Sequence, residues 1–196
     1  WKHKLYTDYR KGKLLNKATL FITELASTDL HKFIVERDLD VNQWKCLLFQ
    51  LMYMITVAQY HYPGFRHNDL KADNILVDIY KPKPGTHIVY IIFGRTYYIP
   101  DLGFRLKLWD FDFAASNDIR NSIHTDPYYN NFGNNRDINP VYDIHIFFNL
   151  TYTYLEFEII SLITIFFEKY LPIDIRGNNS RYTMYGRLTK NTSKYT

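Results

Sequence analysis

The segment from residue 67 to residue 74, HNDLKADN, is a charged cluster between two apolar stretches. Before it, apolar residues from Val41 to about His61 recur at three- and four-residue steps, which predicts an amphipathic helix that Pro63-Gly64 ends. After it, Ile75–Val77 has the composition of a short buried strand. Because both neighbours are expected to be buried, the loop lies against the core, and a solvated surface turn does not explain its charges.

Three residues of this loop suit phosphoryl-transfer chemistry. Asp69 could receive the proton of an attacking hydroxyl, and Lys71 could neutralise phosphate charge. Asn74 adds a carboxamide oxygen that could coordinate Mg²⁺. A solvated turn accounts well for Asn68 and Asp73, but it leaves the other three residues unexplained.

Composition limits the class of protein and its partners. The chain has 196 residues, about one domain, and 46% of it is hydrophobic, enough for a packed core. Its net charge of +4 is a mild excess, so we expect no nucleic-acid partner. Polar residues interrupt the apolar stretch Ile144–Phe167, which predicts buried helices and no membrane span. A single cysteine, Cys46, and an N-terminus without a signal-peptide pattern favour the cytoplasm, or the virion if the source is a virus.

The remaining segments alternate between strand-like and helix-like patterns. Lys17–Leu25 is β-branched and aromatic, as in a strand, and a short helix is expected from about Asp29 to Arg37. Residues 78–105 look like a hairpin or an inserted excursion, and Leu106–Phe113 alternates as a strand. The pattern ends with a long polar loop over 114–140, a mostly helical stretch from Val141 to about Tyr170 and a polar tail.

Three motifs, in this order, resemble those of protein kinases. Residues 67–74 are similar to the kinase catalytic loop, H-R-D-L-K-x-x-N. Residues 107–114, KLWDFDFA, look like the strand and D-F-G turn, which puts Asp110 at the magnesium-binding position. YDIHIFF, from Tyr142 on, is similar to the start of the large buried kinase helix. These motif variants, together with a composition typical of AT-rich genomes, most resemble those of the serine/threonine protein kinases of large DNA viruses, the poxvirus type included.

The resemblance implies an α+β, protein-kinase-like fold, mainly the α-helical C-lobe with a small N-lobe strand and hinge remnant. Residues 1–26 would be the N-lobe remnant and hinge, and residues 27–196 the C-lobe. The C-lobe would contain the catalytic loop at 67–74, an insertion at about 78–105 and an activation segment at 110–140.

The implied function is that of a partial serine/threonine protein kinase domain, which transfers the γ-phosphate of ATP to hydroxyl groups of a protein substrate. ATP and Mg²⁺ are the implied cofactors. Asp69 would be the catalytic base, and Lys71 would steady the γ-phosphate. Asn74 and Asp110 would hold Mg²⁺. The implied nucleotide contacts are Lys71, Asp110 and, in the expected hinge Thr23–Ala26, Glu24 and Ala26.

The sequence also departs from the kinase pattern. Asn68 replaces the arginine that in many kinases pairs with a phosphorylated activation loop, and Asp112 replaces the glycine of D-F-G. The aspartates of the two motifs are 41 residues apart, which implies an insertion. No A-P-E motif precedes Asp143, which is expected to be structural, as is His67. Because a glycine-rich loop and a V-A-I-K-like lysine are missing, we expect this chain alone to bind ATP weakly.

Three alternatives stay open. Small-molecule kinases of the choline or aminoglycoside type often have the sequence HND at this place. A lysine two residues after the catalytic aspartate, as Lys71 is here, is instead typical of serine/threonine protein kinases. Asp110-Phe111-Asp112 also fits the D-x-D metal motif of a nucleotide-sugar transferase, which leaves the loop at His67 unexplained. A catalytically weak pseudokinase or interaction module is favoured by Asp112 and the missing nucleotide lobe, but Asp69, Lys71, Asn74 and Asp110 are all retained.

Overall fold

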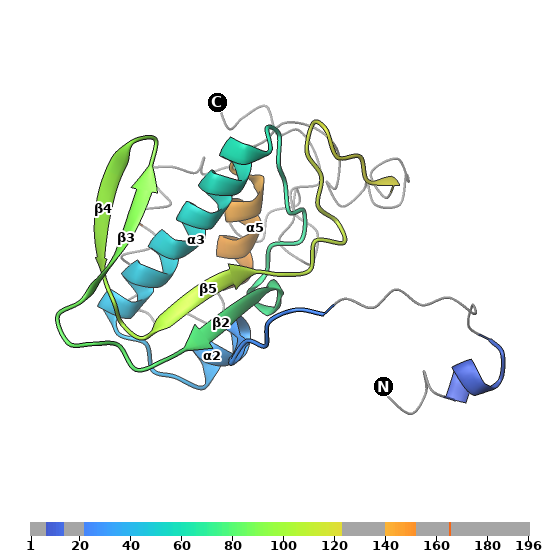
Figure 1. Cartoon of the computed structure of the whole chain (residues 1–196), viewed down its shortest axis with the longest axis horizontal. Coiled ribbons are helices and arrows are strands. Elements are labelled where there is room, and N and C mark those ends of the chain that lie inside the picture. Colours follow the sequence, from blue (N-terminus) through green and yellow to red (C-terminus); the bar gives the residue numbers. More distant parts are fainter. Residues whose placement is uncertain (1–6, 14–21, 123–139, 152–164, 166–196) are drawn as a thin grey trace.

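A computed structural model describes residues 7–13, 22–122, 140–151 and 165 of the chain. These residues form a mixture of helices and antiparallel strands, as the expected α+β class requires (Figure 1). Besides a short helical turn at residues 7–10, the helical elements are α2 (Leu30–Val35), α3 (Val41–His61), the 3₁₀ turn η1 (Ala72–Asn74) and α5 (Tyr142–Thr151). The strands are β1 (Thr28–Asp29), β2 (Ile75–Ile79), β3 (His87–Ile92), β4 (Arg95–Pro100) and β5 (Phe104–Leu108).

Helix α3 is the long central helix, and it confirms the predicted range of residues. A capping box closes its N-terminus: Asp40 Oδ1 accepts the backbone N–H groups of Asn42 and Gln43, and the Gln43 side chain accepts the Asp40 N–H. Beyond its C-terminus the chain turns at Gly64, whose φ of 74° lies in the region that favours glycine. Four residues of the predicted apolar stripe are buried, namely Trp44, Leu47, Leu51 and Ile55, and Cys46 and Gln50 are buried beside them.

This stripe packs under a three-stranded antiparallel sheet with the order β1-β2-β5. Val77 of β2 pairs with Leu106 of β5, and both side chains are buried in the core. The helix expected after Asp29 is α2, and the Asp29 side chain caps it by accepting the Lys32 N–H at 2.7 Å. A buried glutamine joins α3 to β5, because Gln50 Oε1 accepts the Leu106 N–H at 3.0 Å. One continuous core therefore supports the strands on either side of the charged loop.

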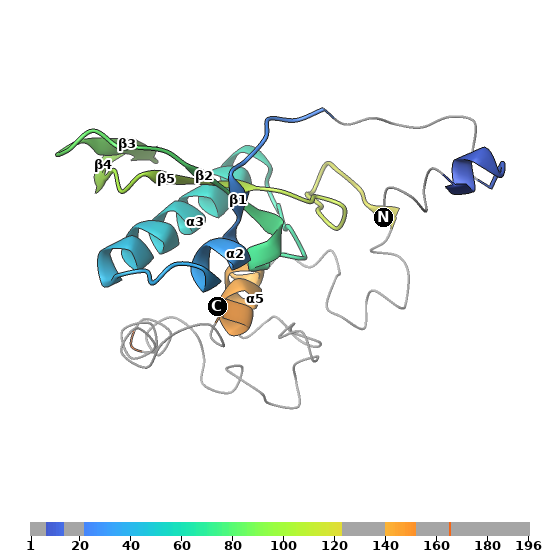
Figure 2. The same ribbon diagram turned by 90° about the horizontal axis from the view of Figure 1, so that it is seen from below.

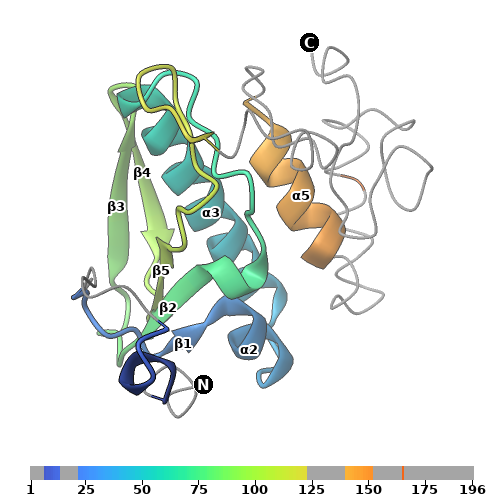
Figure 3. The same ribbon diagram turned by 90° about the vertical axis from the view of Figure 1, so that its right-hand side faces the viewer.

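The segment between β2 and β5, which was predicted as an insertion, contains a β-hairpin, as the sequence predicts. β3 and β4 pair with each other across the two-residue loop Phe93-Gly94, whose φ values of 48° and 76° are typical of a type I′ turn. Tyr90 contacts the rings of Phe49 and Tyr53 of α3 at centroid distances of 5.2 and 4.7 Å. Burial raises the pKa of Tyr90 to about 12. Figures 2 and 3 show α3 between this hairpin and α5.

Helix α5 begins next to the predicted start at Val141 and packs on the far side of α3. Phe147 and Phe148 extend the core. His145 is fully buried, and desolvation lowers its pKa to about 3, so that it is neutral at pH 7. The predicted continuation of the helix to Tyr170 falls almost entirely on residues outside the described ranges. Among the described helices, none has the length and hydropathy that crossing a bilayer requires.

Two strand predictions are wrong in part. Ile22–Leu25, the described end of the strand predicted over Lys17–Leu25, is not a strand, and no strand pairs with it within the described ranges. Ile22 and Leu25 are 86% and 93% exposed, so their apolar side chains do not hold the segment against the core. The strand predicted over Leu106–Phe113 is instead β5, which ends before Asp110 because a φ of 59° there cannot continue a strand.

Candidate active site

A carboxylate at the start of α5 anchors the backbone of the loop 67–74. The two oxygens of Asp143 accept the backbone N–H groups of His67 and Asn68, at 2.7 and 2.8 Å. Asp143 is only 1% exposed, so both hydrogen bonds lie in the core, where each is costly to lose. Asn68 has a φ of 65°, and this left-handed turn directs two successive N–H groups toward one carboxylate. The structural role expected for Asp143 is confirmed.

Within the loop, the three residues expected to carry the chemistry are in contact. Asn74 Nδ2 donates to Asp69 Oδ2 at 2.8 Å and to the Asp69 backbone oxygen at 2.9 Å. Lys71 Nζ forms an ion pair with the same Oδ2 at 3.3 Å. Asp69 and Asn74 are both 5% exposed, whereas the Lys71 side chain is 40% exposed. The arrangement holds the Asp69 carboxylate in one orientation and leaves the Lys71 ammonium accessible to solvent.

The segment that leads to Asp110 is tied to the same loop. Trp109 donates its backbone N–H to the Asn74 carbonyl at 3.0 Å. The Trp109 carbonyl lies 2.8 Å from His67 Nε2, which donates to it in the Nε2–H tautomer. Asp110 therefore directly follows Trp109, whose backbone N–H and carbonyl both form hydrogen bonds with residues of the loop 67–74. His67 is 0% exposed, which confirms it as a buried loop anchor.

The chain after Asp110 returns to pass beside the start of the loop. Arg66 and Ala115 exchange two backbone hydrogen bonds, at 2.9 and 3.0 Å. Asn68 Nδ2 donates to the Phe113 carbonyl at 2.9 Å, so this side chain holds the backbone of the segment. Ser116 is also buried, and its hydroxyl accepts the Ile119 N–H. In the expected activation segment 110–140, residues 123–139 fall outside the described ranges.

Sequence reasoning missed a buried arginine directly before the loop. The Arg66 guanidinium carbon lies 3.7 Å from the centroid of the Tyr142 ring, a cation–π contact. Both residues are buried, and burial is the main cause of the raised pKa of Tyr142. Arg66 directly precedes the loop and Tyr142 begins the YDIHIFF motif, but their 76-residue separation hides the contact in the sequence. The pair is a second link between α5 and the loop, beside Asp143.

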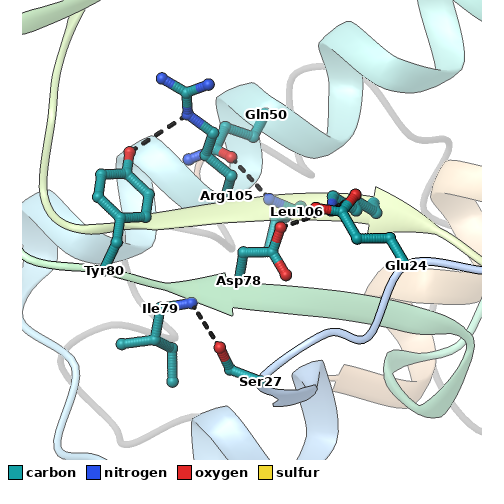
Figure 4. Close-up of polar contacts among 9 residues, drawn as sticks. Glu24, Ser27, Gln50, Asp78, Ile79, Tyr80, Arg105 and Leu106 are labelled. Atoms are coloured by element: carbon teal, nitrogen blue, oxygen red, sulfur yellow. Dashed lines mark hydrogen bonds and ion pairs between the residues drawn. The ribbon is translucent and has the colours of Figure 1, made fainter.

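The described part of the predicted hinge lies beside β2 and β5, and Figure 4 shows Glu24 near the C-terminal end of β5. The Glu24 carboxylate accepts a hydrogen bond from Lys107 Nζ at 2.7 Å, and Asp78 contacts the same ammonium. Hydrogen bonds to Asp78 and then to Glu24 raise the pKa of Lys107. Ala26 is half-buried. The Glu24 side chain is thus paired with Lys107 of β5, and the sequence did not indicate this contact.

Hydrogen bonds of Ser27, directly after the predicted hinge, fix this segment to the sheet. Ser27 donates its N–H to the Val77 carbonyl at 3.0 Å, and its hydroxyl accepts the Ile79 N–H at 3.0 Å. Val77 and Ile79 belong to β2, which directly follows Asn74. One five-residue strand therefore connects the hinge segment to the charged loop.

The described residues contain no group of three or more His, Cys, Asp and Glu side chains that could form a metal cage. Mg²⁺ does not require such a cage, since it is usually bound by one or two carboxylates together with substrate phosphates and water. Asn74 and Asp110 provide oxygen donors of this kind. Because both bonds from Asn74 Nδ2 go to Asp69, the Asn74 carboxamide oxygen faces away from Asp69.

Comparison with known proteins agrees with the motifs. A protein of Acanthamoeba polyphaga mimivirus named as a serine/threonine-protein kinase is 27% identical over 199 aligned residues, which cover 94% of this chain and 42% of the viral protein. A second mimivirus protein named in the same way is 35% identical over 66 residues, 33% of this chain and 17% of that protein. A mitogen-activated protein kinase of Trichoderma harzianum is 40% identical over 58 residues, 30% of this chain and 16% of the fungal protein.

No family model matches the chain. The chain spans less than half of the length of these curated relatives. The similarity to serine/threonine protein kinases, including viral ones, is nevertheless confirmed, and across most of the chain in the first mimivirus protein.

Proposed function

We propose that this chain is the C-lobe and hinge of a serine/threonine protein kinase, which transfers the γ-phosphate of ATP to hydroxyl groups of a protein. The observation that carries the proposal is the contact set around Asp69, in which one carboxylate is oriented by Asn74 and paired with Lys71. The names of the relatives support the same reaction class. Phosphoryl transfer depends mainly on positioning and on neutralised charge, and this cluster offers both.

Asp69 is assigned the role of catalytic base. Asp69 is 5% exposed, and its Oδ2 contacts both Asn74 and Lys71, so the carboxylate has little rotational freedom. A fixed carboxylate can orient the attacking hydroxyl of the substrate and accept its proton. The attacking oxygen then forms the new bond to phosphorus, and the bond from phosphorus to the leaving oxygen of the nucleotide breaks.

Lys71 is assigned the role of compensating negative charge. Its ammonium lies 3.3 Å from Asp69 Oδ2 and is partly exposed, so it can contact an anion that approaches Asp69 from solvent. A cation at this place offsets the repulsion between the Asp69 carboxylate and a phosphate. This contact also explains why a lysine, which can move its charge on a flexible side chain, suits the position.

Asn74 and Asp110 are assigned to Mg²⁺. The donor set fits the ion, because it consists of a carboxamide oxygen turned away from Asp69 and a half-buried carboxylate. When bound, Mg²⁺ supplies neutralising charge on the phosphates of ATP. The Trp109 backbone contacts with His67 and Asn74 would keep Asp110 at a fixed position relative to Asn74.

The hinge role of residues 23–26 remains part of this proposal. Because the Glu24 carboxylate is paired with Lys107, the backbone groups of Glu24 and Ala26 are the better candidates for contact with the nucleotide base. The buried single cysteine, Cys46, suits action in a reducing compartment such as the cytoplasm.

A substrate screen tests the reaction class. The full-length protein is incubated with radiolabelled ATP and Mg²⁺, and with a Ser/Thr peptide library, choline or an aminoglycoside as acceptor. We expect label on Ser/Thr peptides only. Transfer to choline or the aminoglycoside in place of peptides would identify a small-molecule kinase, and nucleotide binding without any transfer would identify a pseudokinase; either outcome contradicts the proposal.

A further inference from the structure

The hairpin of β3 and β4 exposes an apolar outer face. Its inner face packs on α3 through Tyr90, whereas Val89, Ile91 and Tyr98 on the outer face are 53%, 61% and 67% exposed. Val89 is directly opposite Tyr98 in the register, so these side chains form one patch, and Phe93 at the turn is 71% exposed. A hairpin that served only to cover α3 would place polar residues on this face.

The outer edge of β3 carries backbone N–H and carbonyl groups that could pair with another strand. Within the part of the chain that the structure describes, β3 pairs with β4 alone. In a two-residue hairpin the pair next to the loop, here Ile92 and Arg95, is hydrogen-bonded, and pairs then alternate along the ladder. The Asp101 N–H donates to the Thr86 carbonyl at 3.0 Å, as this alternation requires. The N–H and carbonyl groups of Val89 and Ile91 therefore point away from β4, along the outer edge of β3.

The opposite edge, on β4, is less suitable. Pro100 has no N–H, and its carbonyl accepts the thiol of Cys46 at 3.8 Å. Proline is a usual way to block an edge strand from pairing. β3 contains neither proline nor lysine, so it keeps the features of an edge that accepts another strand.

An apolar groove adjoins β3. It has a volume of about 530 Å³, and its lining comes from the C-terminal half of α3 and from the end of β5. Tyr53 belongs to this lining and also packs against Tyr90 of β3, which places the groove next to the strand. The residues that line the groove are Tyr53, Met54, Val57, Ala58, His61, Tyr62 and Leu108.

The charge of the hairpin specifies the partner further. No Asp or Glu occurs between Asp78 and Asp101, whereas Lys81, Lys83 and Arg95 are all present and exposed. A second copy of the chain would bring two such cationic hairpins together, which like-charge repulsion disfavours. An acidic partner would instead be attracted.

From these observations we propose that β3 binds an extended, acidic and apolar segment of another protein by strand addition. The segment pairs with the outward N–H and carbonyl groups of Val89 and Ile91. Alternate side chains of the segment enter the groove on α3, and its acidic residues face the lysines and the arginine of the hairpin. This docking site is independent of the phosphoryl-transfer residues, so it can select a partner whether or not the proposed chemistry is correct.

The experiment measures binding of a fluorescein-labelled dodecapeptide of alternating valine and glutamate to the full chain by fluorescence anisotropy. A matched probe has lysine at every glutamate position. We expect the glutamate probe to bind at least tenfold more tightly, with the difference shrinking as salt is raised. Equal binding of the two probes would overturn the proposal.

Two proline variants separate edge pairing from a general effect on the hairpin. Ile91→Pro removes an outward N–H from β3, and Thr96→Pro, at the opposite residue of the register, removes one from β4. We expect Ile91→Pro to weaken binding at least tenfold and Thr96→Pro to change it less than twofold. Equal loss in both variants, with circular dichroism unchanged, would contradict strand addition at β3.

A charge variant keeps the proposal testable if proline disrupts the hairpin. Lys83→Glu combined with Arg95→Glu should weaken binding of the glutamate probe at least tenfold and tighten binding of the lysine probe. Neither substitution removes a backbone N–H group. Val35→Thr, at an exposed position of α2, serves as the control and should change neither. Sedimentation that shows a dimer abolished by the charge variant, or binding to phosphatidylserine vesicles without binding to the peptide, would assign the surface to a second copy or a membrane and overturn the proposal.

Discussion

The Asp143 carboxylate accepts the backbone N–H of His67 at 2.7 Å, although 76 positions separate the two residues in the chain. The second oxygen of Asp143 accepts the N–H of Asn68 in the same way. Asp69 follows these two residues directly, so the position of the proposed base depends on a residue at the start of α5. The cation–π contact between Arg66 and Tyr142 strengthens the same connection.

Asp143→Asn should destabilise the fold. An asparagine has one acceptor oxygen, and its amide group would face an N–H donor, so one buried backbone N–H loses its partner, at a cost of about 1–3 kcal/mol. Urea unfolding followed by circular dichroism measures the free energy of unfolding. The matched control is Asp118→Asn, an exposed carboxylate in a loop, which should change that free energy by less than about 0.5 kcal/mol. Equal effects of the two substitutions would contradict the anchoring role of Asp143.

His145 should make the fold sensitive to acid. Its pKa is lowered to about 3 in the folded chain and is about 6.5 when unfolded. The unfolded state therefore binds the proton more readily, and the stability contributed by the neutral imidazole is lost as the pH falls from 6.5 toward 3. The slope from this one group is at most about 1.4 kcal/mol per pH unit.

The variant His145→Leu isolates this contribution. Unfolding free energies of both proteins are measured in urea at pH 8, 6, 5 and 4. The difference between wild type and variant should be constant above pH 7 and should shift against the wild type at lower pH. A difference that stays constant over the whole range would show that His145 does not titrate as described.

In an active full-length protein, Asp69→Asn and Asp110→Asn should respond differently to Mg²⁺. If Asp110 binds the ion, its loss weakens Mg²⁺ retention, and excess Mg²⁺ should restore part of the phosphoryl transfer. The Asp69 variant lacks the base, so excess Mg²⁺ should not restore it. The measurement is the rate on a Ser/Thr peptide at increasing Mg²⁺ concentration and fixed ATP. Equal rescue of both variants would count against these two roles.

Activity should not require phosphorylation of the segment after Asp110. Asn68 cannot pair with a phosphate as an arginine does, and its side chain instead holds the Phe113 carbonyl. Candidate sites are Ser116, which is buried, and Ser122, Thr125, Tyr128 and Tyr129. Phosphatase treatment should leave the rate unchanged. Loss of activity that is restored by rephosphorylation at one of these sites would refute this.

Local patterns in the sequence predicted the elements whose signals lie within a few residues. The apolar steps from Val41 to about His61, followed by Pro63-Gly64, predicted α3, whereas its capping box of Asp40 and Gln43 was not predicted. The hairpin was also predictable as an insertion between two strands. In contrast, Lys17–Leu25 has strand-like composition, but Ile22 and Leu25 are exposed and unpaired by any described strand. Strand formation needs a neighbour, which composition does not reveal.

In the candidate site, too, contacts within a short segment were predictable and contacts between distant segments were not. Asp69, Lys71 and Asn74 lie within six residues, so their spacing sufficed to group them, and the structure brings them into contact. The pairing of Lys107 with Glu24 joins residues 83 positions apart, and Gln50 reaches β5 across 56 positions. Such contacts depend on how the elements pack, and no local pattern indicates them.

The proposed chemistry is tested most directly in the full-length protein, by the phosphoryl-transfer rate of Asp69→Asn beside that of Asp73→Asn. Asp73 is a carboxylate of the same loop, but its side chain is 59% exposed, and it pairs with His31 outside the Asp69 cluster. The account predicts that Asp69→Asn lowers transfer to a Ser/Thr peptide by about 10²–10⁴-fold, while Asp73→Asn stays within a factor of about three of the wild type and both variants keep the wild-type circular dichroism spectrum. An Asp69→Asn protein that transfers phosphate as fast as the Asp73→Asn protein would contradict it.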